Sequence, residues 1–129
     1  MNTRRLIKKK PAYQIESQSM QQTLIKDLSL DPDFSLEMYV IYDIFNADDN
    51  DIALLEENVI AEPAVDEVLE SVDTTGKSVL AFEYLPGQYD QRADSAMQCL
   101  MLLNNKKDVR IHSGTLMVMD HVKSEAKRS

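Results

Sequence analysis

The sequence predicts an α+β domain in which tandem β-α-β-type halves form a mainly antiparallel sheet with helices on one face. Segments with an apolar residue at every second position predict strands, and segments with apolar residues three or four positions apart predict helices. These segments follow the order strand, helix, strand twice, in halves that cover about residues 1–72 and 77–129. We expect a single domain, because 129 residues suffice for one hydrophobic core.

The first half opens with a short strand over residues 4–9, which Pro11 ends because proline lacks the N–H that a strand ladder needs. A helix is predicted over 13–28, and a turn at 31–33 follows it. The buried stripe of this helix is expected to contain Met20, Thr23, Leu24 and Leu28.

A long strand is predicted over 35–45, where large apolar side chains occur on both faces. We therefore expect both sides of this strand to be covered, at least in part. One face would carry Leu36, Met38, Val40, Tyr42 and Ile44, and the other Tyr39, Ile41 and Phe45.

A helix over 51–60 and a short strand over 65–70 complete the first half. The acidic and amide residues at 48–51 are expected to cap the helix. A calcium loop is the less suitable interpretation, because the glycine that such a loop requires is absent. The inward residues of the helix are predicted to be Ile52, Leu55 and Val59.

The second half is predicted to contain a strand over 79–85 and a helix over 90–104, joined by a Pro86-Gly87 turn. Asp90 is placed to cap this helix. A charged turn at 106–108 leads into a last strand over 109–119. The buried stripe of the helix is expected to contain Ala96, Cys99 and Leu103.

The two halves also share residues at a nearly constant offset. The first half contains a further helix and strand for which the second half, ending at Ser129, has no counterpart. We expect the chain to be a fragment of a longer protein, with an open sheet edge. A complete protein with a frayed tail, and a subunit that completes its sheet with a second copy, are the alternatives. The matching pairs are Tyr13/Tyr89, Ser19/Ser95, Gln22/Gln98 and Leu24/Leu100 at an offset of 76, and Asp43/Asp120 at 77.

Charge and composition restrict the classes of partner. The net charge of −8 argues against nucleic acids and anionic membranes, which attract Lys and Arg. No apolar run approaches the ~18 residues of a membrane span, and we do not expect the charged start to be a secretory signal, because no apolar run follows it. The single cysteine cannot form a disulfide within the chain and fits the reducing cytosol, so a cytoplasmic location is expected.

Few residues are suited to catalysis. The three glycines lie far apart and form no phosphate-binding loop. Cys99 is expected to be a buried small hydrophobe and not a nucleophile. His112 and His121 lack the spacing of metal ligands. We therefore predict no catalytic, cofactor-binding or metal-binding residue in this chain.

The densest polar segment lies between the predicted strand at 79–85 and the helix at 90–104. Its sequence LPGQYDQRADSA at 85–96 resembles a signature near the start of the long form of phosphoribosylformylglycinamidine synthase, also called formylglycinamide ribonucleotide amidotransferase. All twelve residues agree with that signature. The resemblance extends over essentially the whole chain, although RIHSGT at 110–115 and the methionine-rich strand end at 116–119 depart from the family pattern. The supporting segments are RRLIKKK at 4–10, IYDIF at 41–45 and EPAVD at 62–66.

The resemblance implies a part of a glutamine-dependent, ATP-using carbon–nitrogen ligase. The family enzyme converts formylglycinamide ribonucleotide, ATP and glutamine to formylglycinamidine ribonucleotide in de novo purine biosynthesis, and the full-length enzyme uses ATP and magnesium. Its N-terminal domain resembles a pseudodimer of the small purine-synthesis subunit. That domain packs between the synthetase and glutaminase domains and supports the ammonia path. The resemblance therefore implies a non-catalytic assembly domain, here without its last helix and strand.

Arg92 is the most informative residue of the polar segment, because a cation is poorly placed at a helix N-terminus. We expect it to contact another domain of the enzyme, and a surface pair with Asp90 or Asp94 is the alternative. The aligned residue of the first half is Glu16, so the two halves present different surfaces. The predicted interface comprises Gln88, Tyr89, Asp90, Gln91, Arg92, Asp94 and Ser95.

A small regulatory ligand-binding module with an ACT-like or ferredoxin-like sheet is the alternative function. In that case the turn at 87–95 would hold a small anion at the helix N-terminus. Asp90 and Asp94 argue against this site, because their carboxylates would repel an anion.

Overall fold

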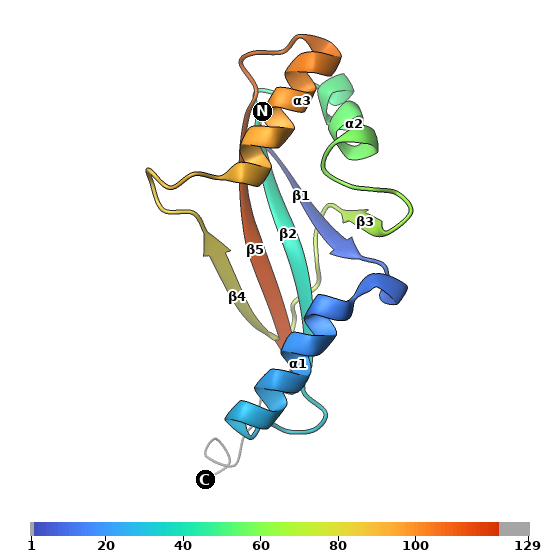
Figure 1. The fold of residues 1–129 in the computed structure, drawn as a ribbon, viewed down its shortest axis with the longest axis vertical. Coiled ribbons are helices and arrows are strands. Elements are labelled where there is room, and N and C mark those ends of the chain that lie inside the picture. The colour runs from blue at the N-terminus through green and yellow to red at the C-terminus, as the bar shows by residue number, and fades with distance from the viewer. Residues whose placement is uncertain (1, 122–129) are drawn as a thin grey trace.

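The computed structural model describes residues 2–121, in which five strands form one antiparallel sheet (Figure 1). The order across the sheet is β3-β1-β2-β5-β4. The predicted α+β class and the mainly antiparallel sheet are thus confirmed. The strands are β1 (Asn2–Lys9), β2 (Ser35–Phe45), β3 (Asp66–Leu69), β4 (Ser78–Glu83) and β5 (Arg110–Asp120).

The helices lie on one face of the sheet, with α2 beside α3 at one end and α1 at the other (Figure 1). The helix predicted over 13–28 begins later, because Pro11–Tyr13 form the short 3₁₀ helix η1 before it. None of the helices in residues 2–121 is long and apolar enough to cross a lipid bilayer. The helices are α1 (Ile15–Leu28), α2 (Asp49–Asn58) and α3 (Gln91–Asn104).

The main core lies between the sheet and helices α2 and α3. Ile44 of β2, Leu55 of α2, and Leu100 of α3 are fully buried there. Burying each such side chain contributes about 1.5–3 kcal/mol relative to exposure. The predicted cap of α2 is confirmed, because Asp48 accepts from the amide of Asp51 and the Asp51 carboxylate accepts from the amide of Asp48.

A second apolar cluster lies on the opposite face of the sheet. Tyr39 and Ile41 of β2 are buried there against Val118 of β5. The segment between β3 and β4 crosses this face (Figure 1), and its Val72 packs on the cluster. The expectation that β2 is covered on both sides is therefore confirmed.

The buried stripe predicted for α3 was wrong. Cys99 is exposed and Leu103 is 52% exposed, whereas Ala93, Ala96 and Leu100 are buried. The predicted and the observed buried sides of α3 are related by a rotation of the helix about its axis. α3 packs against both β5 and α2, and these contacts with elements distant in the sequence decide which side of the helix is buried.

The stripe predicted for α1 is only partly buried. Leu24 is half-buried, Thr23 is exposed, Met20 is 39% exposed and Leu28 is 59% exposed. α1 contacts the sheet mainly through β2, and in the described part of the chain no other helix lies beside it as α2 lies beside α3. An apolar side of α1 therefore faces solvent.

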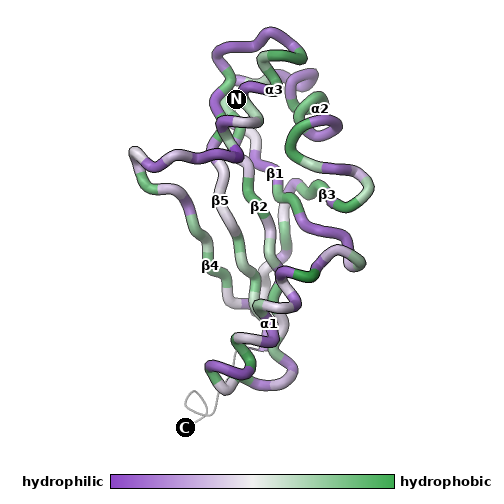
Figure 2. Tube along the Cα trace, in the orientation of Figure 1, coloured by the Kyte–Doolittle hydropathy of each residue, from purple (hydrophilic) through white to green (hydrophobic). Residues whose placement is uncertain are grey.

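Strand β4 is the exposed edge of the sheet. All six of its residues are exposed, and within residues 2–121 it pairs only with β5. Figure 2 shows that much of this strand is apolar, and Leu80 and Phe82 are 47% and 51% exposed. A long, apolar edge with unpaired backbone groups favours pairing with another strand.

Candidate functional site

The predicted interface segment forms an ordered connection between β4 and α3. We call residues 85–95 the polar elbow. The turn at Pro86 and Gly87 closes with a hydrogen bond from the Gln88 amide to the Leu85 carbonyl at 2.9 Å, and Gly87 adopts a φ of +88°. The Gln88 side-chain oxygen in turn accepts from the Leu85 amide at 2.6 Å. Residues 85–89 are exposed, so the elbow projects from the sheet as a structured loop.

Asp90 fixes the end of the elbow to the sheet. Its carboxylate caps α3 by accepting from the Ala93 amide at 3.1 Å. The same group accepts from the Ser113 amide at 2.7 Å and the Ser113 hydroxyl at 2.6 Å. Burial opposes its ionisation, yet the bonds from Ser113 and Ala93 together lower the pKa of Asp90. The anion site suggested for this helix N-terminus therefore already contains the carboxylate of the protein itself.

Asp94 also serves the local structure. Its Oδ2 accepts from the Tyr89 hydroxyl at 2.9 Å and from Gln98 Nε2 at 2.8 Å. The bond to Asp94 raises the pKa of Tyr89, because it favours the protonated phenol. Gln88, Tyr89, Asp90 and Asp94, four of the seven predicted interface residues, thus have partners within the elbow and its surroundings.

The other three predicted residues are Gln91, Arg92 and Ser95. Their side chains make no hydrogen bond or ion pair within residues 2–121. The surface pair of Arg92 with Asp90 or Asp94 is therefore not formed. All three line a shallow hollow that also contains Cys99. The elbow thus holds three polar side chains without a partner in residues 2–121 at a capped helix end.

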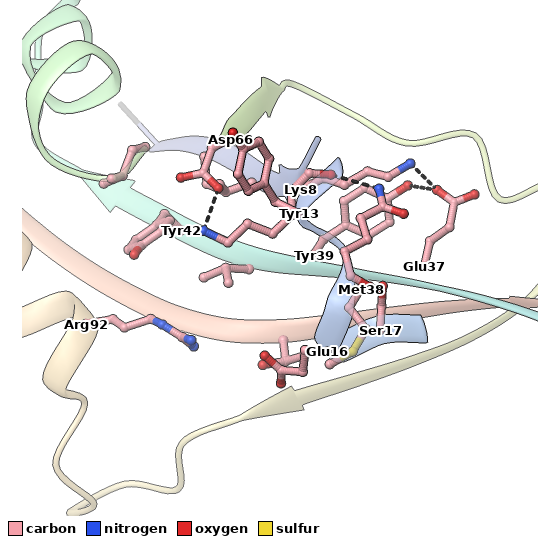
Figure 3. A pocket seen from close by; sticks show the side chains of 16 residues that line it. Lys8, Tyr13, Glu16, Ser17, Glu37, Met38, Tyr39, Tyr42, Asp66 and Arg92 are labelled. Atoms are coloured by element: carbon pink, nitrogen blue, oxygen red, sulfur yellow. Dashed lines mark hydrogen bonds and ion pairs between the residues drawn. The ribbon is translucent and has the colours of Figure 1, made fainter. Parts of the chain in front are cut away.

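Arg92 also reaches a second cavity, between α1 and α3 over the helix-bearing face of the sheet (Figure 3). This cavity has a volume of about 270 Å³. We call it the interhelix cavity. Its apolar lining includes Ile7, Val40 and Ile60, and its polar lining includes Tyr13, Glu16, Ser17, Tyr42 and Thr115.

Two ion pairs at the interhelix cavity neutralise four of its six charged residues. Lys9 Nζ lies 2.9 Å from the buried Asp66 Oδ1, in an ion pair without a well-directed hydrogen bond. Lys8 Nζ lies 2.8 Å from Glu37 Oε2. The hydrogen bond from Lys8, and then that from Tyr39, lowers the pKa of Glu37. The remaining charges, Arg92 and Glu16, point toward one another across the cavity without forming an ion pair (Figure 3).

Tyr42 connects the two hollows that Arg92 lines. The side chain is buried on β2, and burial raises its pKa although the Arg92 cation acts in the opposite direction. Its position next to Arg92 was not predicted, because Tyr42 and Arg92 lie in different halves of the sequence. The alternation of apolar residues in β2 predicted only that Tyr42 shares a face of the strand with Val40 and Ile44.

The remaining candidate residues lie apart from both hollows. His112 packs edge-on against Phe45, with ring centroids 5.4 Å apart. His121 lies next to Asp120, with 3.9 Å between Nε2 and Oδ2. Among residues 2–121, no three His, Cys, Asp or Glu side chains converge as a metal site would need.

No protein-family model, no curated protein and no solved structure matches the chain.

Proposed function

We propose that the chain is the N-terminal assembly domain of a long-form phosphoribosylformylglycinamidine synthase in the cytoplasm. In this role it holds the synthetase and glutaminase domains together and supports the ammonia path, while ATP, magnesium and the catalytic residues belong to those domains. The observation that carries the proposal is the polar elbow. The residues of the family-like run LPGQYDQRADSA form an exposed, capped connection that leaves Gln91, Arg92 and Ser95 free for a partner.

The arrangement of the strands is compatible with a pseudodimer. The units β1-α1-β2 and β4-α3-β5 each contribute one central strand, β2 or β5, and one outer strand, β1 or β4. Exchanging the two units therefore leaves the arrangement β1-β2-β5-β4 unchanged. In the first half, β3 pairs with the outer edge of β1. The equivalent outer edge of β4 has no strand on it within residues 2–121.

The helices repeat this asymmetry. α2 packs beside α3, whereas the equivalent side of α1 is open in the described residues. By the offset of 76, Met20 and Leu24 of α1 correspond to the buried Ala96 and Leu100 of α3. We propose that in the whole enzyme a helix and a strand equivalent to α2 and β3 cover α1 and β4. Self-association through β4 is the alternative.

Replacing Arg92 by alanine in the complete enzyme tests the assembly role. We expect R92A to lower glutamine-dependent turnover while ammonia-dependent turnover stays close to wild type, because added ammonia bypasses the path between domains. The matched control is R110A, since Arg110 is exposed and its side chain, among the residues described, hydrogen-bonds only to backbone carbonyls. Wild-type activity of R92A with both nitrogen sources would refute the proposed contact.

A further inference from the structure

We propose that the interhelix cavity binds a small zwitterion, an α-amino acid, with its carboxylate at Arg92 and its ammonium group at Glu16. This site goes beyond the assembly role and does not depend on it. The site is also distinct from the amides at the N-terminus of α3, where the Asp90 carboxylate already accepts a hydrogen bond from the Ala93 amide.

The charge pattern of the cavity favours a ligand that carries both a positive and a negative charge. Lys8 and Lys9 are paired with Glu37 and Asp66, so they contribute little net charge. Arg92 and Glu16 come from different helices and face one another across the cavity (Figure 3) without a partner in residues 2–121. A ligand that presents a carboxylate to one and an ammonium group to the other satisfies both.

Phosphates and nucleotides fit this pattern poorly. A phosphate placed near Arg92 would share the cavity with the carboxylate of Glu16, which no lysine in residues 2–121 neutralises, whereas Glu37 and Asp66 are paired with Lys8 and Lys9. Like charges in a partly desolvated space repel more strongly than in water. An amino acid avoids this repulsion, because its ammonium group lies at Glu16 while its carboxylate lies at Arg92.

The size and lining of the cavity fit a molecule of amino-acid size. A volume of about 270 Å³ lies just below the ~300 Å³ at which sites for drug-sized ligands begin. Ile7, Val40 and Ile60 provide an apolar part for aliphatic side-chain atoms. Tyr13 and Tyr42 add phenolic groups that make no side-chain hydrogen bond with the residues described.

The test is a calorimetric or NMR titration of the protein with each of the twenty amino acids. We expect at least one to bind saturably, with chemical-shift changes at the residues of the interhelix cavity. Blocking either charge of that amino acid, as its N-acetyl derivative or its carboxamide, is expected to weaken binding about tenfold or more, equivalent to about 1.4 kcal/mol. Inorganic phosphate and adenosine monophosphate are expected to bind more weakly than the amino acid.

Two variants assign the roles of the charged groups. R92Q and E16Q are each expected to weaken amino-acid binding about tenfold or more, and K107Q, an exposed charge outside the cavity, is the control. Glu16 and Arg92 are both exposed, so we expect R92Q and E16Q to keep the fold. An NMR spectrum of each variant verifies this. E16Q also separates this site from the docking role, because Glu16 lies outside the polar elbow.

Three results would overturn the proposal. One is the absence of saturable binding by all twenty amino acids at about 10 mM, a concentration well above a millimolar dissociation constant. Another is unchanged affinity in R92Q or in E16Q. The third is tighter binding of phosphate than of any amino acid.

Discussion

Asp90 joins helix α3 to strand β5 through a single carboxylate. It caps the helix at Ala93 and accepts two bonds from Ser113. Loss of an N-cap costs about 1 kcal/mol, and Ser113 is buried, so its amide and hydroxyl would lose a charged partner. We therefore expect D90A to lower the free energy of unfolding by about 2 kcal/mol or more, measured by urea denaturation.

The matched control for D90A is D49A. Asp49 lies in the first turn of α2 but is exposed and is not the capping residue. We expect D49A to change the stability by only a few tenths of a kcal/mol, as is usual for a surface substitution, roughly within 0.5 kcal/mol. Equal stability of D90A and D49A would show that the Asp90 network contributes little.

The Asp90 network also makes stability depend on pH. Its pKa is lowered in the folded state, so just below the unfolded value of about 3.9 the unfolded chain binds more protons. The contribution of Asp90 is therefore complete above that value and is lost as the pH falls through the folded pKa. We expect the stability difference between wild type and D90N to shrink as urea denaturation is repeated from pH 6 toward pH 3. A difference that stays constant over this range would contradict the assignment.

Single residues were predictable from the sequence where their role is local. The run 48–51 and Asp90 were predicted to cap helices because an acceptor at a helix start satisfies free amides whatever the rest of the fold does, although α2 begins at Asp49 and not at the predicted residue 51. Cys99 was wrongly predicted to be buried, because a 3-4 spacing of apolar residues runs along more than one side of α3. The contacts of α3 with β5 and α2 decide which side is buried, and both are contacts between elements that lie apart in the sequence.

At the level of elements, Gly114 controls how closely β4 approaches β5. A Cβ at this position would lie 2.6 Å from the backbone carbonyl oxygen of Phe82, and a backbone atom cannot move aside as a side chain can. We expect G114A to displace β4 and to lower the free energy of unfolding by about 1–3 kcal/mol. Hydrogen exchange should show the loss of protection mainly in Ser78–Glu83, because β5 is the one strand of the described chain that pairs with β4.

The control for G114A is T115A, which changes the next residue of β5 without adding an atom near the Phe82 carbonyl. We expect the β4 amides of T115A to keep most of their protection. Equal loss of protection in G114A across β1, β2 and β4 would indicate global destabilisation, and would contradict the specific close approach at Gly114.

At the level of the whole molecule, the sequence predicted the elements better than their arrangement. Strand positions and the double strand-helix-strand order follow from local periodicity. The pairing of β2 with β5 at the centre joins the two halves, and no local pattern specifies it. The interhelix cavity depends on that pairing, because it brings α1 of one half opposite Arg92 of the other. Its lining residues therefore could not be predicted together.

The open side of the molecule leads to a prediction about association. Phe82 pairs with Thr115, which pairs with Val40, so Phe82 lies on the helix-bearing face beside the open side of α1. An uncovered apolar edge should pair with the same edge of a second copy when no other strand is supplied. We expect the isolated chain to form dimers in analytical ultracentrifugation and F82E to shift it to monomer, because pairing would bury the new charge.

The control for this prediction is L102E, because Leu102 is exposed near the end of α3, away from β4. L102E should dimerise like wild type, and neither change should unfold the protein, since both side chains are more than half exposed. Urea denaturation of both variants checks this point. A wild-type chain that stays monomeric at roughly millimolar concentration, where even a weak interface of about −4 kcal/mol associates, would show that the β4 edge does not drive self-pairing.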